Sequence, residues 1–158
     1  MFRGPKNRFG LVNCSSDRTD GNLMNTGNGK CTDPADRPWQ LPMQSRPRFI
    51  YELAEPGDEV IYPNPGFPIY ESMINFCGAK AVPMQLREEI QFHPDLGEFA
   101  KLVNKNTRVV ILNSPHNPCG SILSSEELER IATIVREQSD AYILSDEVYK
   151  DLLYSCLL

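Results

Sequence analysis

Short apolar runs alternate with amphipathic segments between residues 58 and 146, and this alternation is the feature that most restricts the fold. The runs have the length and the β-branched content of strands. They occupy residues 58–62, 79–86, 107–112 and 141–144. Repeated strand–helix–strand units lead to right-handed crossovers and parallel pairing. The sequence therefore predicts an α/β fold, a three-layer sandwich in which a mostly parallel sheet has helices on both faces.

Helical spacing between these strands predicts three helices, over residues 68–77, 95–103 and 124–138. In the first helix, the apolar stripe is expected to contain Ile69, Met73, Phe76 and Cys77. The third helix begins with Ser124 and Glu127, which have the spacing of a capping box. Its apolar stripe is expected to contain Leu128, Ile131, Ile134 and Val135. Pro63 and Pro65 are predicted to end the first strand, because proline cannot donate a hydrogen bond to a sheet.

The first part of the chain differs in composition from the rest. Residues 1–50 contain eight Lys or Arg against four Asp or Glu, whereas residues 51–158 contain eight against seventeen. The first stretch also holds five of the thirteen prolines, and its apolar residues follow no period. Such a composition disfavours a packed core, so residues 1–53 are predicted to be irregular or disordered. "GNGK" at 27–30 does not complete a phosphate-binding loop, since Met24 and Cys31 break that motif.

Several classes of protein are excluded by composition. No apolar stretch reaches the length of a membrane-spanning helix, and the amino terminus lacks a secretory signal, which favours a cytoplasmic location. With a formal net charge of −5, the chain is expected to have no nucleic-acid and no membrane partner. Neither His93 nor His116 belongs to a cluster of ligands, so no metal site is predicted. The cysteines have no CxxC pair and are interpreted as free thiols: Cys14, Cys31, Cys77, Cys119 and Cys156.

Unusual polar loops follow two of the predicted buried strands. "NSPHNPCG" (113–120) follows "VVIL", and "SDEVY" (145–149) follows "AYIL". In open α/β sheets, ligands bind at the carboxyl ends of the strands, so both loops are candidates for a site. Taken singly, these residues have structural explanations, since Asn and Pro form turns and Asp146 can cap a following turn. Turn formation explains the combination of the two loops less well.

Together the two loops resemble the motifs of fold-type I pyridoxal-phosphate enzymes, specifically class I/II aminotransferases of the aspartate aminotransferase kind. The signature of that family is N-P-x-N-P-T-G followed by D-E-x-Y, and twenty-nine positions separate Asn117 from Asp146 here. "PGDEVIYPNPGFPIYES", "GAKAVPMQL" and "NTRVVILNSPHNPCG" resemble consecutive segments of the same family. The resemblance covers about residues 54–154. It implies that residues 54–158 are part of a cofactor-binding large domain, and that residues 1–53 are not family-like.

This resemblance implies roles for five residues toward the cofactor, pyridoxal 5′-phosphate. Asp146 would keep the proton on the pyridine nitrogen, because a carboxylate stabilises the cation beside it. Asn117 and Tyr149 would donate hydrogen bonds to the phenolic oxygen. Phe67 would stack on the ring, although a core aromatic that opens a helix is an equal alternative. Tyr70 would lie near the cofactor phosphate, often that of the neighbouring subunit.

Other features that the resemblance implies are not found in this sequence. The family lysine that binds the cofactor lies well beyond D-E-x-Y, and Lys150, directly after Tyr149, is not that residue. A distant arginine for the substrate carboxylate and an upstream phosphate-binding turn are not found either. We therefore expect a fragment whose isolated chain does not transaminate. A first stretch from another reading frame or a mispredicted start is favoured over a truncated paralogue.

Two other functions remain open from the sequence. A non-catalytic remnant or binding module would also contain these motifs without the lysine. A cysteine-dependent hydrolase would use Cys119, which stands where the family usually has threonine, with His116 as its base. A turn-filling role for Cys119 is the simpler interpretation. For the aminotransferase, the resemblance implies an amino acid and a 2-oxo acid as substrates and a homodimer as the assembly.

Overall fold

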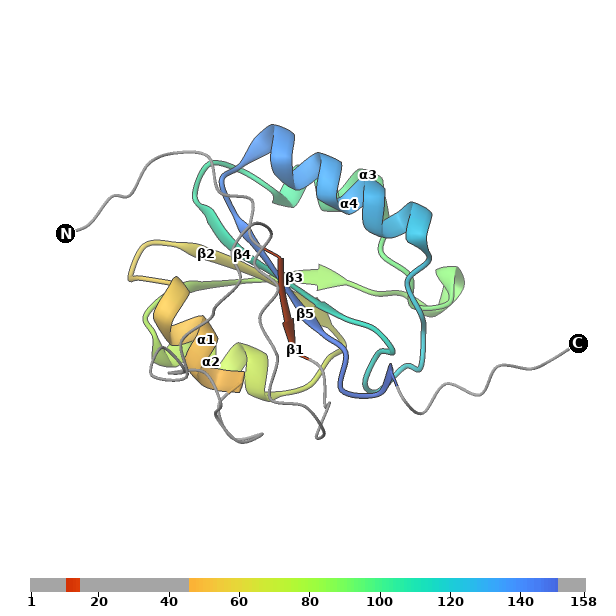
Figure 1. Cartoon of the computed structure of the whole chain (residues 1–158), viewed down its shortest axis with the longest axis horizontal. Coiled ribbons are helices and arrows are strands. Elements are labelled where there is room, and N and C mark those ends of the chain that lie inside the picture. Colours follow the sequence, from red (N-terminus) through yellow and green to blue (C-terminus); the bar gives the residue numbers. More distant parts are fainter. Residues whose placement is uncertain (1–10, 15–45, 151–158) are drawn as a thin grey trace, which may run out of the picture.

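A five-stranded parallel sheet lies between two layers of helices in the computed structural model, which describes residues 11–14 and 46–150 (Figure 1). The strand order is β1-β5-β4-β2-β3, and every neighbouring pair is parallel. The strands are β1 (Leu11–Cys14), β2 (Glu59–Asn64), β3 (Lys80–Gln85), β4 (Thr107–Asn113) and β5 (Tyr142–Asp146). The helices are α1 (Arg46–Leu53), α2 (Ile69–Phe76), the 3-10 helix η3 (Glu88–Ile90), α3 (Leu96–Leu102) and α4 (Ser125–Gln138). The predicted α/β sandwich is confirmed.

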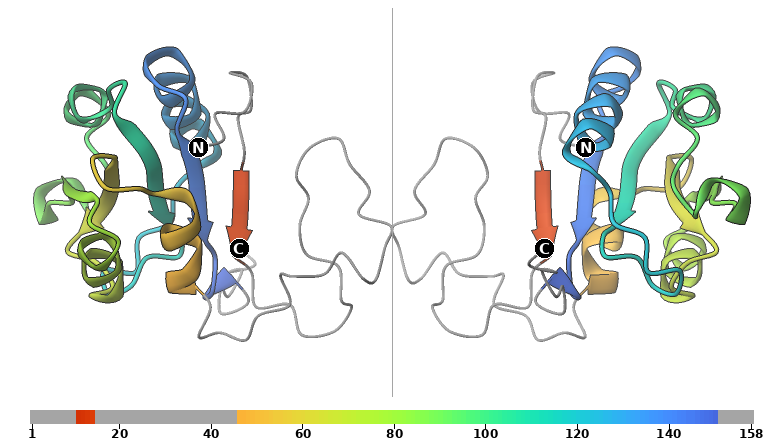
Figure 2. Two further views of the ribbon diagram at one scale, coloured as in Figure 1. Left: turned by 90° about the vertical axis from the view of Figure 1, so that its left-hand side faces the viewer. Right: turned by 90° about the vertical axis from the view of Figure 1, so that its right-hand side faces the viewer.

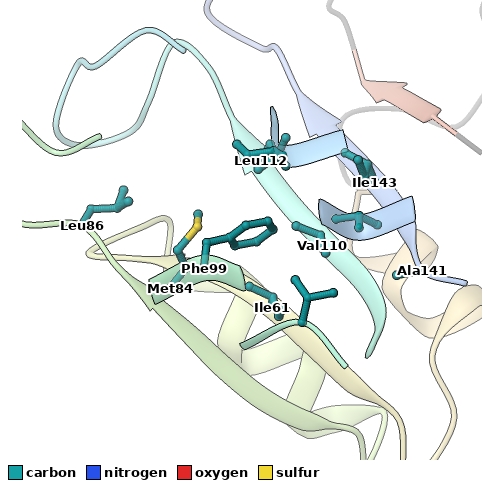
Figure 3. Packing of buried hydrophobic residues seen from close by; sticks show 11 residues of the cluster. Ile61, Met84, Leu86, Phe99, Val110, Leu112, Ala141 and Ile143 are labelled. Carbon is teal, nitrogen blue, oxygen red and sulfur yellow. The ribbon is translucent and has the colours of Figure 1, made fainter. Parts of the chain in front are cut away.

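Each face of the sheet has its own apolar core, because side chains alternate between the two faces along a strand. Helices α1 and α2 cover one face and α3 and α4 the other (Figures 1 and 2). The core under α3 and α4 contains the fully buried Phe99, which lies among Ile61, Met84 and Val110 (Figure 3). In the described part of the chain, residues 11–14 and 46–150, no helix is long and apolar enough to cross a membrane.

The described residues of the stretch that was predicted to be irregular, residues 1–53, form two regular elements. Arg46–Leu53 forms α1, and Ile50 of this helix is buried against the α2 side of the sheet. Leu11–Cys14 forms β1, which pairs with β5 at the edge of the sheet (Figure 2). The prediction was therefore wrong for these two segments. Packing of α1 on the sheet and pairing of β1 with β5 outweigh the unfavourable local composition. The division at residue 53 stays a prediction.

Strand β2 continues past the point where proline was expected to end it. The carbonyl of Asn64 accepts a hydrogen bond from the N–H of Leu86, on the β3 side. Because backbone groups of successive residues point to opposite sides of a strand, the nitrogen of Pro63 faces the β4 side. There, pairing with β4 extends only to Ile61. Pro63 therefore removes no hydrogen bond from the sheet, and β2 ends at Asn64.

The apolar stripe of α2 was predicted one position away from its true place. Tyr70 and Ile74, four residues apart, are its buried residues, whereas Phe76 is 74% exposed. Ile69, Met73 and Cys77 flank the buried pair and are partly buried. Leu128 of α4 also departs from the prediction, since it is 40% exposed and lines a shallow groove with Ile122 and Pro115.

Helix α4 begins with the predicted capping box. The hydroxyl of Ser124 accepts a hydrogen bond from the N–H of Glu127, and the Glu127 carboxylate accepts one from the N–H of Ser124. His93 Nδ1 lies 2.7 Å from the same carboxylate. Burial raises the pKa of Glu127, but the hydrogen bonds from Ser124 and His93 outweigh burial and leave the pKa below its ordinary value.

Removal of this cap has a defined cost. We expect Ser124→Ala to lower the free energy of unfolding by about 1 kcal/mol, since the N–H of Glu127 loses its acceptor. Urea denaturation followed by circular dichroism measures the loss. Ser125→Ala is the matched control, because Ser125 is exposed and lies inside the helix. Equal stabilities of the two variants would contradict a stabilising capping box.

Candidate functional site

The candidate site lies at the carboxyl ends of β4 and β5, where the two predicted loops begin. Asn113 and Asp146 are register partners and end their strands side by side. Ile111 and Leu144, two residues earlier in each strand, belong to the core on the α1 and α2 side. Because side chains alternate along a strand, Asn113 and Asp146 belong to the same face as these residues. The two loops therefore start together, facing α2.

Asp146 is held by a tyrosine from α2. The Tyr70 hydroxyl donates to Oδ2 of Asp146 at 2.7 Å, and the two residues are 4% and 5% exposed. Oδ1 of Asp146 accepts from the N–H of Val148. The carboxylate is therefore fixed in direction before any ligand binds. The hydroxyl of Tyr70 therefore contacts Asp146 of its own chain, and a place for Tyr70 near the cofactor phosphate stays a prediction.

A second pair lies in the two loops. Nδ2 of Asn117 donates to the Tyr149 hydroxyl at 3.2 Å, and both residues are partly buried. The amide has a second N–H, and the hydroxyl has one O–H, so the pair still has donors for an acceptor placed between or beside them. The peptide bonds Ser114–Pro115 and Asn117–Pro118 are cis, as is Asn64–Pro65 before Phe67.

Phe67 stands at the exposed side of this arrangement. Its ring meets that of Tyr70 edge to face, with centroids 6.0 Å apart and an interplanar angle of 81°. The Phe67 side chain is 42% exposed, so the alternative of a core aromatic that opens the helix is not what the structure has. A half-exposed ring in contact with Tyr70, which holds the buried carboxylate, leaves an aromatic surface that a planar ligand can cover. All five predicted residues thus form two contacting groups.

Asn113 connects these groups, and the sequence assigned it no role. Its Nδ2 donates to the backbone carbonyl of Asp146 at 2.9 Å, while its Oδ1 accepts from the N–H of Asn117 at 2.7 Å. The side chain is 4% exposed. An asparagine at the start of a loop is ordinary turn chemistry, and only the pairing of β4 with β5 reveals the contact with Asp146.

His116 and Cys119 do not form a catalytic pair. Nδ1 of His116 accepts from the backbone N–H of Cys119 at 3.4 Å, and no hydrogen bond joins the Cys119 thiol to this ring among the described residues. Burial raises the pKa of the Cys119 thiol and lowers the pKa of His116. A neutral thiol without a base in contact is a poor nucleophile. Within residues 11–14 and 46–150, no cluster of three or more metal-ligating side chains occurs.

The buried His116 predicts a pH dependence of stability. Its pKa in the folded chain is below the ordinary value of about 6.5, so below that pH the unfolded chain binds more protons. Wild-type stability should therefore fall as the pH drops below about 6.5, with a slope of up to about 1.4 kcal/mol per pH unit. His116→Gln removes this contribution.

Urea denaturation of both proteins from pH 8 to pH 5 measures the two slopes. They should coincide near pH 8, where His116 is neutral in both states, and diverge below about 6.5. Parallel curves over the whole range would contradict a buried neutral His116.

Comparison with known proteins gives one consistent family. Residues 48–157 match the profile of aminotransferase class I and II. Aspartate aminotransferase from Pyrococcus horikoshii is 44% identical over 102 residues, which are 65% of this chain and 26% of the relative. Arginine–pyruvate transaminase from Pseudomonas aeruginosa is 41% identical over 102 residues, with the same two shares. The chain thus spans about a quarter of the length of these curated relatives.

Solved structures agree with the sequence relatives. Aspartate aminotransferase from Thermus thermophilus with maleate superposes with a TM-score of 0.67 and 34% identity, over 71% of this chain and 29% of that one. Cystalysin from Treponema denticola, whose structure contains a pyridoxal 5′-phosphate cofactor, gives a TM-score of 0.59 and 29% identity over 64% of this chain and 27% of that one. This chain belongs to the aminotransferase class I and II family.

Proposed function

We propose that this chain binds the ring of pyridoxal 5′-phosphate, and that the whole protein transfers an amino group between an amino acid and a 2-oxo acid. The observation that carries the proposal is the linked pair of groups at the ends of β4 and β5. One group presents a buried carboxylate, Asp146, and the other presents amide and phenol donors, Asn117 and Tyr149. Substituted pyridine rings with a phenolic oxygen need both kinds of partner.

Each residue has a separate task in this proposal. When bound, the cofactor supplies an electron sink for the charge that develops on the amino-acid α-carbon. Asp146, oriented by Tyr70, holds a proton on the ring nitrogen. Asn117 and Tyr149 donate hydrogen bonds to the phenolic oxygen and stabilise its negative charge. Phe67 covers one ring face and excludes water from it.

The covalent lysine of the family is assigned to no residue of this chain. Lys150 lies directly after Tyr149, where the family motif has no such role. We therefore propose that the isolated chain contributes ring binding without turnover. A homodimeric assembly with an amino acid and a 2-oxo acid as substrates is part of the same proposal, and it rests on family membership.

Pyridoxine 5′-phosphate is the suitable probe for a first test. It keeps the ring nitrogen, the phenolic oxygen and the phosphate, but it has no aldehyde that would react with exposed lysines. Isothermal titration should give one site per chain. Tyr149→Phe should bind the probe about fivefold more weakly, since one donor to the phenolic oxygen is removed. Equal affinities of the two proteins, or no binding to either, would refute the proposed ring site.

A further inference from the structure

We propose that Asn113 is a positioning residue that sets the separation between the two ends of the ring site. This inference rests on the proposed function, because the two ends are defined by the cofactor ring. One end is the carboxylate of Asp146, which belongs to β5, and the other is the donor pair formed by Asn117 of the loop after β4 and Tyr149 of the loop after β5. Asn113 is hydrogen-bonded to the backbone of both segments.

Both ends of the Asn113 amide are used, and each in a different segment. Nδ2 donates to the carbonyl of Asp146 at 2.9 Å, and Oδ1 accepts from the N–H of Asn117 at 2.7 Å. The N–H of Ser114 donates to the same Asp146 carbonyl at 3.1 Å. The side chain is 4% exposed, so water cannot readily replace either bond. The Asn113 amide therefore bonds to both segments at once, beside the direct bond from Ser114.

An ordinary turn-forming asparagine would not have this geometry. In a side-chain turn, the amide oxygen accepts from a backbone N–H of its own loop, as Oδ1 does here with Asn117. The donor group of such a residue is not required. Here Nδ2 crosses to the neighbouring strand, where Asn113 and Asp146 are register partners. Asn113 therefore acts on the relative position of two segments rather than on one loop.

The consequence for the ring is geometric. Ring nitrogen and phenolic oxygen have a fixed separation in the ligand, so Asp146 and the Asn117–Tyr149 pair must be held at a matching separation. Tyr70 fixes the direction of the Asp146 side chain. The Asn113 amide constrains the Asn117 backbone relative to the Asp146 backbone, together with the bonds Ser114–Asp146 and Asn117–Tyr149.

The first test needs no ligand. Amide hydrogen exchange measured by NMR reports the protection of the Asn117 N–H in the free chain. Asn113→Ala should lower this protection at least about tenfold, whereas Asn113→Asp, which keeps an acceptor oxygen, should preserve it. Asn106→Ala is the matched control, because Asn106 is exposed and precedes the opposite end of β4. Unchanged protection in Asn113→Ala would overturn the inference, whatever the chain binds.

A second test separates positioning from structure. At pH 8, Asn113→Asp should bind pyridoxine 5′-phosphate about tenfold more weakly than wild type, because the introduced carboxylate repels the Asp146 carbonyl. Near pH 5 the introduced carboxyl, with a pKa raised by burial, regains a proton and can donate as the amide did. At that pH, the affinity of Asn113→Asp for the probe should then be within about threefold of the wild-type affinity.

The absorption bands of the bound ring give the spectroscopic readout, because they report how far the phenolic oxygen is ionised. In Asn113→Asp at pH 8, the ionised fraction of the phenolic oxygen should shift toward the value of the free probe. In Asn106→Asp it should stay as in wild type. Wild type measured at both pH values controls for any pH effect of the probe and of the other ionisable groups at the site, which are Asp146, Tyr149 and His116. A loss of affinity that is the same at both pH values would contradict the positioning role. If wild type does not bind the probe although Asn113→Ala exposes Asn117, the ring site fails while the link between the segments stands.

Discussion

Asp146→Asn is expected to weaken the binding of pyridoxine 5′-phosphate by roughly ten- to a hundredfold, because a hydrogen bond to a charged group contributes about 1.5–3 kcal/mol. The substitution keeps the shape of the side chain and an oxygen that can accept from Tyr70 at the position of the 2.7 Å bond. What it removes is the negative charge that stabilises a protonated ring nitrogen. Isothermal titration at pH 7 measures the effect.

The matched control is Asp140→Asn. Asp140 is exposed and precedes the amino end of β5, the end opposite to Asp146. Its substitution should leave the affinity for the probe unchanged. Thermal melts of both variants check that the fold persists. Identical dissociation constants for wild type and Asp146→Asn would contradict the assignment of Asp146 to the ring nitrogen.

Phe99→Ala is expected to have the largest effect on stability, a loss of about 3–5 kcal/mol. The ring is fully buried among Ile61, Met84 and Val110, where α3 packs on the sheet (Figure 3). Truncation removes its apolar burial and leaves a cavity that the surrounding strands cannot fill without moving. A loss of this size is a large part of the roughly 5–15 kcal/mol that stabilises an ordinary domain.

Phe76→Ala is the control for this prediction, since it makes the same chemical change at a side chain that is 74% exposed. We expect a change within about 0.5 kcal/mol, because little packing is lost at the surface. Urea unfolding curves of wild type and both variants give the three free energies. A similar loss in the two variants would contradict the placement of Phe99 in the core.

Sequence pattern was sufficient for the elements whose local signals agree with their tertiary surroundings. "TRVVIL" is a continuous apolar run, and it forms β4, which is buried on both faces. Ser124 and Glu127 lie three residues apart, and their bonds are made within one helix turn. The prediction of the buried residues of α2 was wrong because the helix has apolar or aromatic residues on two neighbouring faces. These include Ile69, Met73, Phe76 and Tyr70, and either face could be the buried one. Only the packing against β2 and β4 decides between them.

For the candidate site, the sequence indicated candidate residues but not how they are connected. Asn117, Asp146 and Tyr149 belong to motifs that can be read along the chain. The bond between Tyr70 and Asp146 joins residues 76 positions apart, and it depends on how α2 packs at the end of β5. The link through Asn113 depends on the register of β4 and β5. Such contacts have no local signal, so they could not be predicted from a single sequence.

Strand β1 makes the site sensitive to the part of the chain outside the family match. It lies before residues 48–157, yet its Cys14 is the register partner of Asp146. A shift of β1 by one residue would place a different residue beside Asp146 and would exchange the two faces of the strand. A change within residues 11–14 that alters this register can thus alter the surroundings of a carboxylate more than a hundred positions away. Designed changes at the amino terminus should be checked first by their effect on Asp146.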